Sequence, residues 1–330
     1  HPQANKLKFT EALPRTTGVY MFTDAQGEVL YVGKASNLRS RVRSYFGTNE
    51  SRTKVGSLLK LMQGIEFIQT PDLLTAEVLE LRIIGRLRPR YNHAGTRTAK
   101  YCYVRLTTDE EWPRLMVSKT PSAKGLCIGP ISTRNMATEV VDAIESVIPL
   151  RRCTVRMGRN YVAPEGAPVC SAARLGLAQC PCSGTAEPES YANAVQQAAD
   201  ALTGKSSFVR DALTERMNAH SEAQRYEEAA YLRDRIQTFE TVLRRQEQAE
   251  KLCSQGKFTV SFDNIVYEVD NGVLASTRNA DQLFMPLSSL SKQVQEAIIP
   301  PAGVHDDHGV LRNDAMDEVL CIAKFLEAQK

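Results

Sequence analysis

The sequence predicts an α+β protein with several domains, and three changes along its 330 residues indicate this organisation. Residues 14–95 alternate between strand-like and helix-like stretches. Residues 151–189 are irregular and rich in Gly, Pro and Cys. A strongly helical stretch follows, and short strand-like runs then return. A chain of this length is expected to fold as about two to four domains.

The changes in pattern divide the chain into segments with different characters. These are a small α/β domain (1–98), an α/β extension (99–150), a cysteine-rich segment (151–205), a helical hairpin (206–250) and a mixed C-terminal β/α domain of unassigned role (251–330). The pattern also predicts helices near residues 54–62, 75–87, 135–148 and 313–328. It predicts strands at residues 65–70, 101–106, 114–118, 258–262, 265–269 and 273–276.

The charge of the chain is unevenly distributed. Residues 1–100 contain 16 Lys and Arg against 8 Asp and Glu, a net charge of +8, whereas the rest of the chain carries −5 of the total of +3. A basic amino-terminal domain indicates a polyanionic partner. We expect that partner to be a nucleic acid, and the motif resemblance described below implies that it is double-stranded DNA.

The composition also indicates a cellular compartment. No apolar run is long enough to span a bilayer, and no signal-peptide pattern opens the chain, so we expect no membrane partner. Eight cysteines without a secretory signal favour reduced thiols or a metal site over a disulfide framework. We therefore expect a cytoplasmic protein. Residue 1 is His rather than Met, which is consistent with a fragment or a processed chain.

Two short strands near the amino terminus each contain a tyrosine, in the sequences Gly18-Val19-Tyr20 and Tyr31-Val32-Gly33. If residues 24–27 form a four-residue hairpin loop, Tyr20 lies directly opposite Tyr31. A bulge at Gly27 would shift this register by one residue.

A helix predicted over residues 38–46 follows these strands. Leu38, Val42 and Tyr45 mark its buried face, and Arg41 lies one turn before Tyr45. With Lys34, these side chains and the strand tyrosines are expected to converge on one small surface. The alternative is a pair of ordinary strand aromatics beside a solvated helix face that carries Arg39, Arg41 and Arg43.

The helix predicted over residues 75–87 ends before Pro89 and carries two glutamates. Glu80 lies within the apolar stripe of this helix, and Glu77 lies near its edge. A buried carboxylate is costly unless it is paired or bound to a cation. Glu80 is therefore either a metal ligand or one half of an ion pair with Arg86 or Lys34.

Together these motifs resemble the GIY-YIG nuclease domain of the UvrC family, with Val19 and Val32 in place of the motif isoleucines. The family's metal-binding glutamate lies twelve residues before its motif asparagine, which corresponds to Glu80 and Asn92. The resemblance implies a DNA endonuclease with Mg²⁺ or Mn²⁺ on Glu80. It assigns the catalytic residues as Tyr20, Tyr31, Lys34, Arg41, Tyr45, Glu80 and Asn92.

The physical chemistry of these side chains allows such roles. A tyrosine of pKa near 10 is a poor base at neutral pH, and three pKa units correspond to about 4 kcal/mol. Lys34, Arg41 and a divalent cation would favour the phenolate. Basic side chains around the site are expected to hold the DNA backbone without reading its sequence. They are Arg39, Arg43, Arg52, Lys54, Arg88 and Arg90.

Four cysteines lie within thirty residues of turn-rich chain, at positions Cys153, Cys170, Cys180 and Cys182. Zinc sites usually contain two closely spaced pairs, and only one close pair exists here. The segment resembles the cysteine region of the UvrC family, which implies a [4Fe-4S] cluster on these four residues. It departs from the family because Ala178 occupies the third position and Cys180 occupies a new one. Free thiols are the alternative.

Residues 208–246 have apolar positions at helical spacing, which predicts an antiparallel helix pair. The sequence from Tyr226 to Ile236 resembles the UVR motif, with Tyr226 in place of a phenylalanine. The resemblance implies that Tyr226, Glu227 and Ala230 bind a UvrB-like protein. An ordinary helix pair packed on its own domain is the alternative.

The resemblance covers about residues 14–246, and nothing after Lys257 offers the separated aspartates and histidine of a second nuclease domain of RNase H type. This is typical of UvrC homologues that make one cut, and of actinobacterial fusions to a DEDD-type exonuclease. We therefore expect a nucleotide-excision-repair endonuclease that makes a single incision near a lesion or distortion. The alternatives are a DNA-binding scaffold that recruits a UvrB-like helicase and a transposon-type or restriction-type GIY-YIG nuclease.

Overall fold

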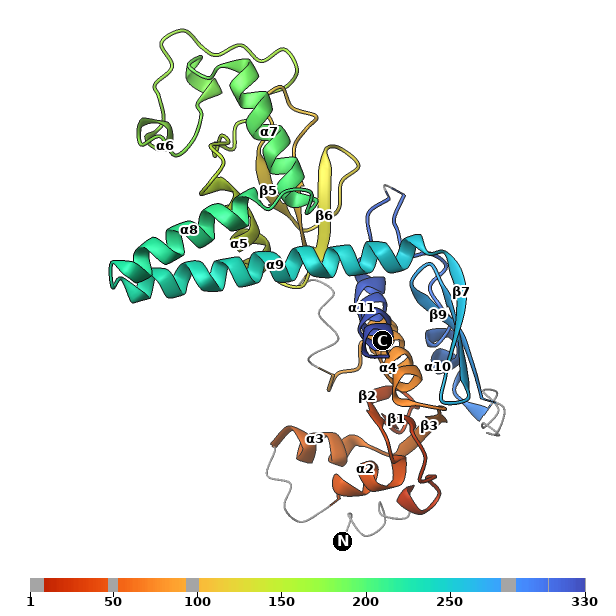
Figure 1. The fold of residues 1–330 in the computed structure, drawn as a ribbon. Helices are drawn as coiled ribbons and strands as arrows, with labels where there is room; N and C mark the ends of the chain where they lie inside the picture. Colours follow the sequence, from red (N-terminus) through yellow and green to blue (C-terminus); the bar gives the residue numbers. More distant parts are fainter. Residues whose placement is uncertain (1–8, 47–52, 93–100, 280–288, 308, 330) are drawn as a thin grey trace. The chain divides into compact units, whose positions relative to one another are not determined.

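The computed structural model describes residues 9–46, 53–92, 101–279, 289–307 and 309–329 (Figure 1). The chain forms two compact units. Unit 1 contains residues 1–98, 249–304 and 313–330, and unit 2 contains residues 99–248 and 305–312. The predicted α+β class is confirmed. The predicted division into five segments remains a prediction, but residues 249–304 and most of the tail belong to the same unit as the amino-terminal domain.

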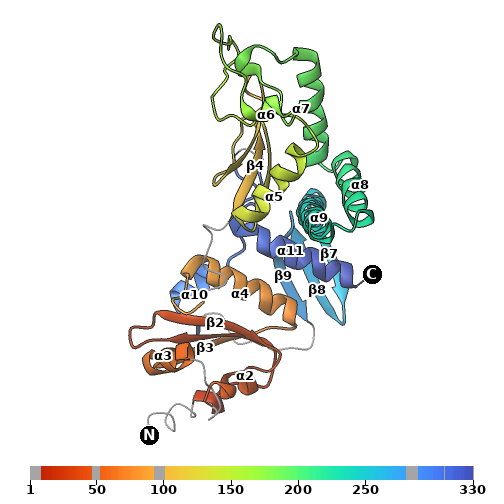
Figure 2. The same ribbon diagram turned by 90° about the vertical axis from the view of Figure 1, so that its left-hand side faces the viewer.

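Unit 1 is built on an antiparallel sheet in which β1 (Gly18–Thr23) lies between β2 (Val29–Ala35) and β3 (Gly64–Gln69). Helices α2 (Leu38–Ser44) and α3 (Thr53–Leu61) cover one face, and α4 (Leu73–Leu87) covers the other (Figure 2). Alternation along β1 separates two cores, because Tyr20 and Phe22 pack toward α2 and α3 whereas Val19 and Met21 pack toward α4. Because β1 is the central strand, β2 lies at an edge of this sheet.

The predicted hairpin register is wrong. Tyr20 pairs with Gly33, and Tyr31 pairs with Phe22. The cause is the turn, in which the Asp24 carboxylate accepts hydrogen bonds from the backbone N–H groups of Gln26 and Glu28, both at 2.9 Å. An irregularity between Phe22 and Thr23 then shifts β2 along β1. Because the total shift is two residues, Tyr20 and Tyr31 still lie on the same face of the sheet.

Helix α4 has well-defined ends. The Asp72 carboxylate accepts a hydrogen bond from the Thr75 N–H at 2.9 Å and so caps the amino terminus. At the other end Arg88 adopts a left-handed conformation with φ of 49°, and Pro89 follows. The helix predicted over residues 75–87 is confirmed and begins two residues earlier.

The C-terminal part of unit 1 adds a second antiparallel sheet and two helices. β7 (Lys257–Phe262), β8 (Ile265–Asp270) and β9 (Val273–Asn279) correspond to the three predicted strands and pair in sequence order. α10 (Lys292–Ala297), which was not predicted, packs on α4 and shares its core. The predicted terminal helix, α11 (Asn313–Ala328), also packs on α4.

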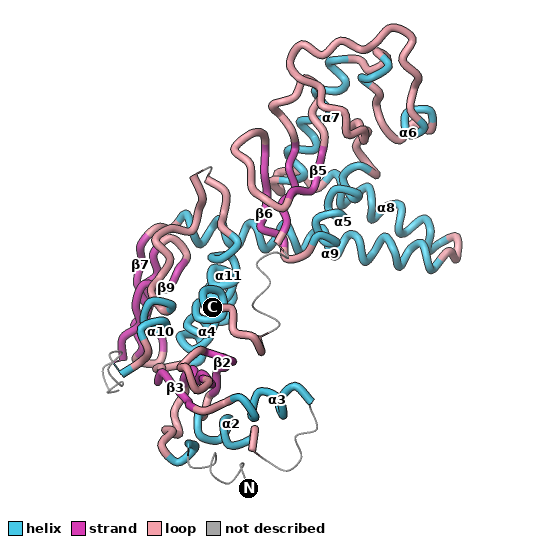
Figure 3. The backbone as a smooth tube through the Cα atoms, turned by 180° about the vertical axis from the view of Figure 1, so that it is seen from behind, coloured by secondary structure: helices cyan, strands magenta, loops and turns pink. Residues whose placement is uncertain are grey.

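Unit 2 combines a three-stranded sheet with a group of helices. β4 (Cys102–Leu106) lies between β5 (Leu115–Ser118) and β6 (Leu126–Ile131), and β6 was not predicted. The helices are α5 (Arg134–Glu145), α6 (Ser171–Arg174), α7 (Pro188–Leu202), α8 (Phe208–Glu222) and α9 (Tyr226–Ser254), whose last turns belong to unit 1. Figure 3 shows that the chain between α5 and α7 is mostly loop, as its composition predicts.

Within the described part of the chain, no helix is both long enough and apolar enough to cross a membrane. The cytoplasmic location remains a prediction.

Candidate active site

Three tyrosine hydroxyls meet on the face of the first sheet that α2 covers. The Tyr20 and Tyr45 hydroxyl oxygens are 2.8 Å apart, and the Tyr45 hydroxyl donates to Tyr31 at 3.3 Å. Their ring centroids are 6.1–6.2 Å apart, and Phe22 completes the aromatic group. Tyr20 is fully buried, and Tyr31 is partly exposed. The predicted meeting of Tyr20, Tyr31 and Tyr45 is therefore present, through diagonal rather than direct cross-strand neighbours.

The two glycines of the motif allow this packing. A Cβ atom on Gly33 would lie 2.4 Å from the Tyr20 hydroxyl oxygen, because the Tyr20 ring lies directly over this residue. A Cβ atom on Gly18 would lie 2.1 Å from the Ile68 carbonyl oxygen on β3. Glycine is required at both positions because of close approach, and neither has a positive φ.

Arg41 lies over the ring of Tyr45, with its guanidinium carbon 5.3 Å from the centroid. Burial raises the pKa of the Tyr20 hydroxyl, and the neighbouring hydroxyls of Tyr45 and Tyr31 raise it further. Burial also raises the pKa of Tyr31. Arg41 acts in the opposite direction on both but is outweighed. In the protein alone both phenols are therefore protonated at neutral pH, and the expectation that Lys34, Arg41 and a divalent cation together favour the phenolate remains a prediction.

Lys34 and Glu80 pair on the opposite face of the sheet, together with Glu77. The Lys34 ammonium lies 2.9 Å from the Glu77 carboxylate and 3.6 Å from that of Glu80, and the Lys34 backbone N–H donates to Glu80 at 3.2 Å. Burial raises the pKa of Glu80, and Lys34 opposes this effect. Of the two partners expected for Glu80, Lys34 is the one observed. Arg86 instead donates to the carbonyl oxygens of Glu296 and Ala297.

These residues form two contact groups, one on each face of β2. Tyr31 belongs to the core on the α2 side of β2, whereas Val32 belongs to the core on the α4 side, where Lys34 meets α4. Only the backbone of β2 lies between the two groups, because neighbouring residues of a strand point to opposite faces. Both groups consequently meet at the edge of the sheet.

Asn92 fixes that edge. Its side-chain oxygen accepts from the Val32 N–H and its side-chain nitrogen donates to the Val32 carbonyl, both at 2.8 Å. Asn92 is buried. Its amide side chain pairs with both backbone groups of Val32, as the backbone of a neighbouring strand would. These contacts fix the backbone of β2, and the role of Asn92 in shaping the site remains a prediction.

The residues expected to contact DNA differ in their availability. Arg43, Arg88 and Arg90 are exposed. Arg39 uses its guanidinium to bind the carbonyl oxygens of Leu13 at 2.6 Å and Glu11 at 2.9 Å. Arg52 and the side chain of Lys54 lie outside the described residues.

The donor set on α4 fits a cation of the magnesium type. Such an ion retains several waters and is bound through one or two carboxylates, so Glu80 suffices as its protein ligand. Among the residues that the structure describes, no three His, Cys, Asp or Glu side chains are arranged to hold a metal ion. A site with few protein ligands is the form that this arrangement allows.

The four predicted cysteines lie in one neighbourhood of unit 2. The sulfur atoms of Cys180 and Cys182 are 3.1 Å apart, and Cys170 also forms hydrogen bonds with Cys180. Burial raises the pKa of the Cys180 thiol, but hydrogen bonds from Cys170, Ser183 and Cys182 outweigh burial and lower this pKa to about 7. Burial and the hydrogen bond with Cys180 raise the pKa of Cys182 to about 12.

Arg151 was missed by the sequence reasoning, although it organises the start of this segment. Its buried guanidinium pairs with the carboxylate of Glu110 and donates to the carbonyl oxygen of Cys153 at 3.0 Å and to the Cys153 sulfur at 3.4 Å. An Arg directly before an Arg-Cys pair is an ambiguous signal, because charged residues are usually exposed.

The predicted helix pair, α8 and α9, packs on the rest of unit 2 through the middle of α9. Its tip, which we define as the connection between the helices and the first residues of α9, is exposed. Arg235 pairs with Glu139 of α5 at 3.0 Å, and Phe239 is buried. At the tip, Tyr226 is 65% exposed and Tyr231 is 56% exposed. Of the residues expected to bind a partner, Tyr226 and Glu227 are exposed and Ala230 is half-buried.

Comparison with known proteins identifies the parts of the chain. Residues 16–93 match the family model of the UvrC-like GIY-YIG domain, residues 101–201 match the middle domain of the UvrC/Cho excinucleases, and residues 209–242 match the UvrB/UvrC motif. The chain is a UvrC homologue. Its resemblance to the UvrC family, inferred from the motifs, is confirmed.

Individual UvrC proteins align with about seven tenths of the chain. UvrABC system protein C of Syntrophus aciditrophicus is 36% identical over 71% of this chain and 37% of its own length. The protein of the same name from Desulforudis audaxviator is 36% identical over 74% of this chain and 38% of its own length. The chain thus spans less than half the length of these relatives.

A solved structure also resembles the amino-terminal domain. It is the GIY-YIG N-terminal endonuclease domain of Thermotoga maritima UvrC, bound to its catalytic divalent cation, magnesium. It is 34% identical and covers 26% of this chain and 96% of its own, with a TM-score of 0.25.

The contact between Tyr20 and Gly33 leads to a stability prediction. Gly33→Ala should destabilise the protein by about 1–3 kcal/mol, because the new methyl group displaces a fully buried ring in a packed core. Gly85→Ala is the matched control, since nothing lies within 4 Å of its Cβ position and alanine favours a helix. Urea unfolding of both variants measures the difference. Equal midpoints for Gly33→Ala and wild type would contradict the packing argument.

Proposed function

We propose that this UvrC homologue is a metal-dependent DNA endonuclease of the nucleotide-excision-repair type, which hydrolyses one phosphodiester near a lesion or distortion. The observation that carries the proposal is the presence of both chemical groups at the edge of β2. The hydrogen-bonded phenols and Arg41 lie on one side, and Lys34 and Glu80 lie on the other.

Each side of the strand has a distinct task in this proposal. A divalent cation bound by Glu80 would stabilise negative charge on the phosphoryl and leaving oxygens. Lys34, which neutralises Glu80 in the protein alone, remains held by Glu77 at 2.9 Å and keeps a positive charge beside the phosphate. With that cation bound, an ionised hydroxyl of the hydrogen-bonded set Tyr20, Tyr45 and Tyr31 would accept the proton of the attacking water. The exposed Arg43, Arg88 and Arg90 bind the DNA backbone.

A second candidate function is a DNA-binding scaffold that recruits a UvrB-like helicase and leaves its nuclease domain idle without an activator. The exposed aromatic tip of α8 and α9 favours recruitment. A nicking assay with Mg²⁺, in the presence and absence of UvrB and on damaged and undamaged duplex, separates the two functions. Nicks that need both Mg²⁺ and Glu80 support the enzyme.

The nuclease proposal predicts the effect of one carboxylate. Glu80→Gln should abolish cutting and leave DNA affinity within a few fold, because the change removes the cation ligand but no exposed basic side chain. Glu28→Gln, an exposed carboxylate in the same domain, is the control and should cut like wild type. Nicking rates and a DNA-binding titration measure both effects. Near wild-type cutting by Glu80→Gln would remove Glu80 from the site.

Recruitment of a UvrB-like protein by the α8–α9 tip leads to a separate prediction. Tyr226→Glu should weaken binding strongly, because an unpaired charge would be buried at the interface. Gln237→Glu is exposed on the same face of α9, three turns farther from the tip, and should bind normally. Pull-down of UvrB, with circular dichroism as the folding control, measures the effect. Equal binding by Tyr226→Glu and wild type would exclude this surface.

We also propose that Cys153, Cys170, Cys180 and Cys182 hold a [4Fe-4S] cluster. The 3.1 Å between the Cys180 and Cys182 sulfur atoms and the lowered pKa of Cys180 support the proposal, since the thiolate is the ligand form. The four described thiols do not form a ligand set by themselves, so the cluster would have to draw them together. Protein purified without oxygen should be brown and contain iron, and Cys180→Ser should lose both. Cys127→Ser, outside the segment, should keep them. Colourless wild-type protein with zinc, or with no metal, would exclude the cluster.

A further inference from the structure

The segment after the family matches is built into the candidate nuclease domain. The matches end at residue 242, whereas residues 249–304 and 313–330 belong to unit 1 together with the amino-terminal domain. α11 packs along α4, the helix that carries Glu77 and Glu80. The C-terminal segment is therefore placed where it can act on the cation-binding side of the site.

The strongest link is a buried ion pair between these two helices. Arg82 of α4 donates to both carboxylate oxygens of Glu318, at 2.9 Å and 2.6 Å, and both side chains are more than nine-tenths buried. Arg82 also donates to the carbonyl oxygens of Ile298 and Leu274, and the Leu274 N–H donates to Glu318. Arg82 thereby ties α4 to three separate elements of the C-terminal segment.

The second link lies one turn further along α11. The Cys321 thiol lies beside the carboxylate of Glu77, and both line a pocket between α4, β8 and α11. The same carboxylate holds the Lys34 ammonium at 2.9 Å, and the Lys34 N–H donates to Glu80. A continuous set of contacts thus runs from α11 to the candidate cation ligand.

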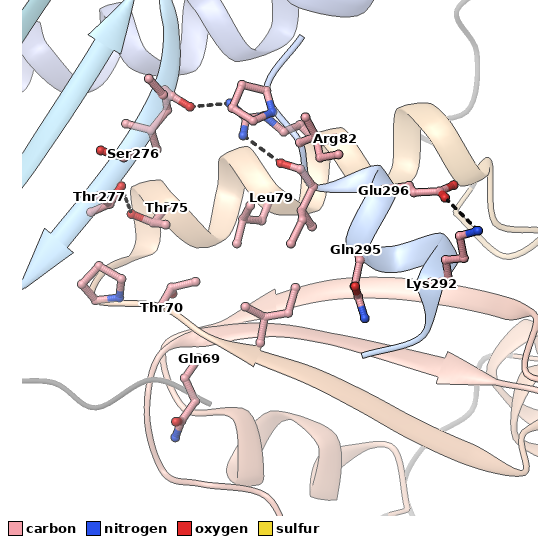
Figure 4. A pocket seen from close by; sticks show the side chains of 17 residues that line it. Gln69, Thr70, Thr75, Leu79, Arg82, Ser276, Thr277, Lys292, Gln295 and Glu296 are labelled. Carbon is pink, nitrogen blue, oxygen red and sulfur yellow. Dashed lines mark hydrogen bonds and ion pairs between the residues drawn. The ribbon is translucent and has the colours of Figure 1, made fainter. Parts of the chain in front are cut away.

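The segment also holds both ends of α4. The Tyr267 hydroxyl of β8 donates to the Asp72 carboxylate at 2.5 Å, and Asp72 caps the start of the helix. Near its end, Arg86 donates to the carbonyl oxygens of Glu296 and Ala297. Beside Arg82, a cavity of about 700 Å³ opens between β3, α4, β9 and α10 (Figure 4). The C-terminal segment therefore contacts α4 at separate positions and leaves part of its surface uncovered.

We infer that α11 is a positioning element of the candidate active site, and that Glu318 and Cys321 hold α4 and Glu77 so that Lys34 and Glu80 keep the arrangement that accepts a divalent cation. The inference rests on the proposed function. Without its partner on α11, the half-exposed Glu77 carboxylate would turn toward solvent. Lys34 would then have Glu80 as its remaining carboxylate partner and would compete with the cation.

The test compares two substitutions at Cys321. Cys321→Val removes the thiol donor beside Glu77 and introduces an apolar side chain of similar size, whereas Cys321→Ser keeps a donor. Valine should weaken Mn²⁺ binding about tenfold, as for other residues that hold a metal ligand in place. It should also raise the Mg²⁺ concentration needed for half-maximal nicking by a similar factor. Serine should restore both values.

Glu318→Gln supplies the second variant and Arg86→Met its control. Both variants weaken the attachment of α4 to the C-terminal segment, but Arg86 lies nine residues along the helix from Glu77. Glu318→Gln should weaken Mn²⁺ binding, and Arg86→Met should lower only the melting temperature. Equal Mn²⁺ affinities for wild type, Cys321→Val and a folded Glu318→Gln would overturn the inference. Equal weakening by Arg86→Met would also overturn it.

The readouts separate this inference from the proposed function. Free Mn²⁺, measured by electron paramagnetic resonance, reports cation binding without any cutting. If wild type binds Mn²⁺ but never nicks DNA, with or without UvrB, the nuclease proposal fails and the Cys321 comparison still decides the role of α11. If wild type binds no Mn²⁺, the inference about α11 is wrong.

Discussion

Strand β2 lies at the edge of its sheet, and its alternating side chains serve two different clusters. Tyr31 contributes to the buried phenols on one face, and Lys34 contributes to the charged group on the other. The strand can hold both only if its own edge is fixed, and Asn92 does this through two hydrogen bonds to Val32. Gly33 must lack a side chain so that Tyr20 can lie across the strand. Each motif residue on β2 therefore has a geometric reason as well as a chemical one.

Buried arginines organise both units in a similar way. Arg82 pairs with Glu318 in unit 1, and Arg151 pairs with Glu110 in unit 2, and each also donates to several carbonyl oxygens. Such pairs gain little over apolar packing, but removal of one partner typically costs about 3–5 kcal/mol. Their effect is to specify which segments lie together, because no other residue type satisfies so many acceptors at once.

The sequence predicted local features well and long-range contacts poorly. The helix containing Glu80 followed from its apolar spacing, and the meeting of three tyrosines followed from strand alternation and helix spacing. The hairpin register was wrong because the hydrogen bonds of Asp24 determine the turn, and loop length alone does not reveal them. The contacts of Glu318 and Cys321 join residues more than two hundred positions apart, so no local pattern marks them.

In the protein alone, neither the Lys34–Glu80 group nor the phenols of Tyr20 and Tyr31 carry an uncompensated charge. Burial raises the pKa of Glu80, yet Lys34 partly compensates by lying beside it, so the carboxylate has a counter-ion that a divalent cation can replace. Burial also raises the pKa values of Tyr20 and Tyr31, and Arg41 does not overcome this effect. Ionisation of a phenol therefore requires additional positive charge near β2. On the proposed function, a cation held by Glu80 supplies that charge from the opposite side of a single strand, which couples cation binding to activation of the phenols.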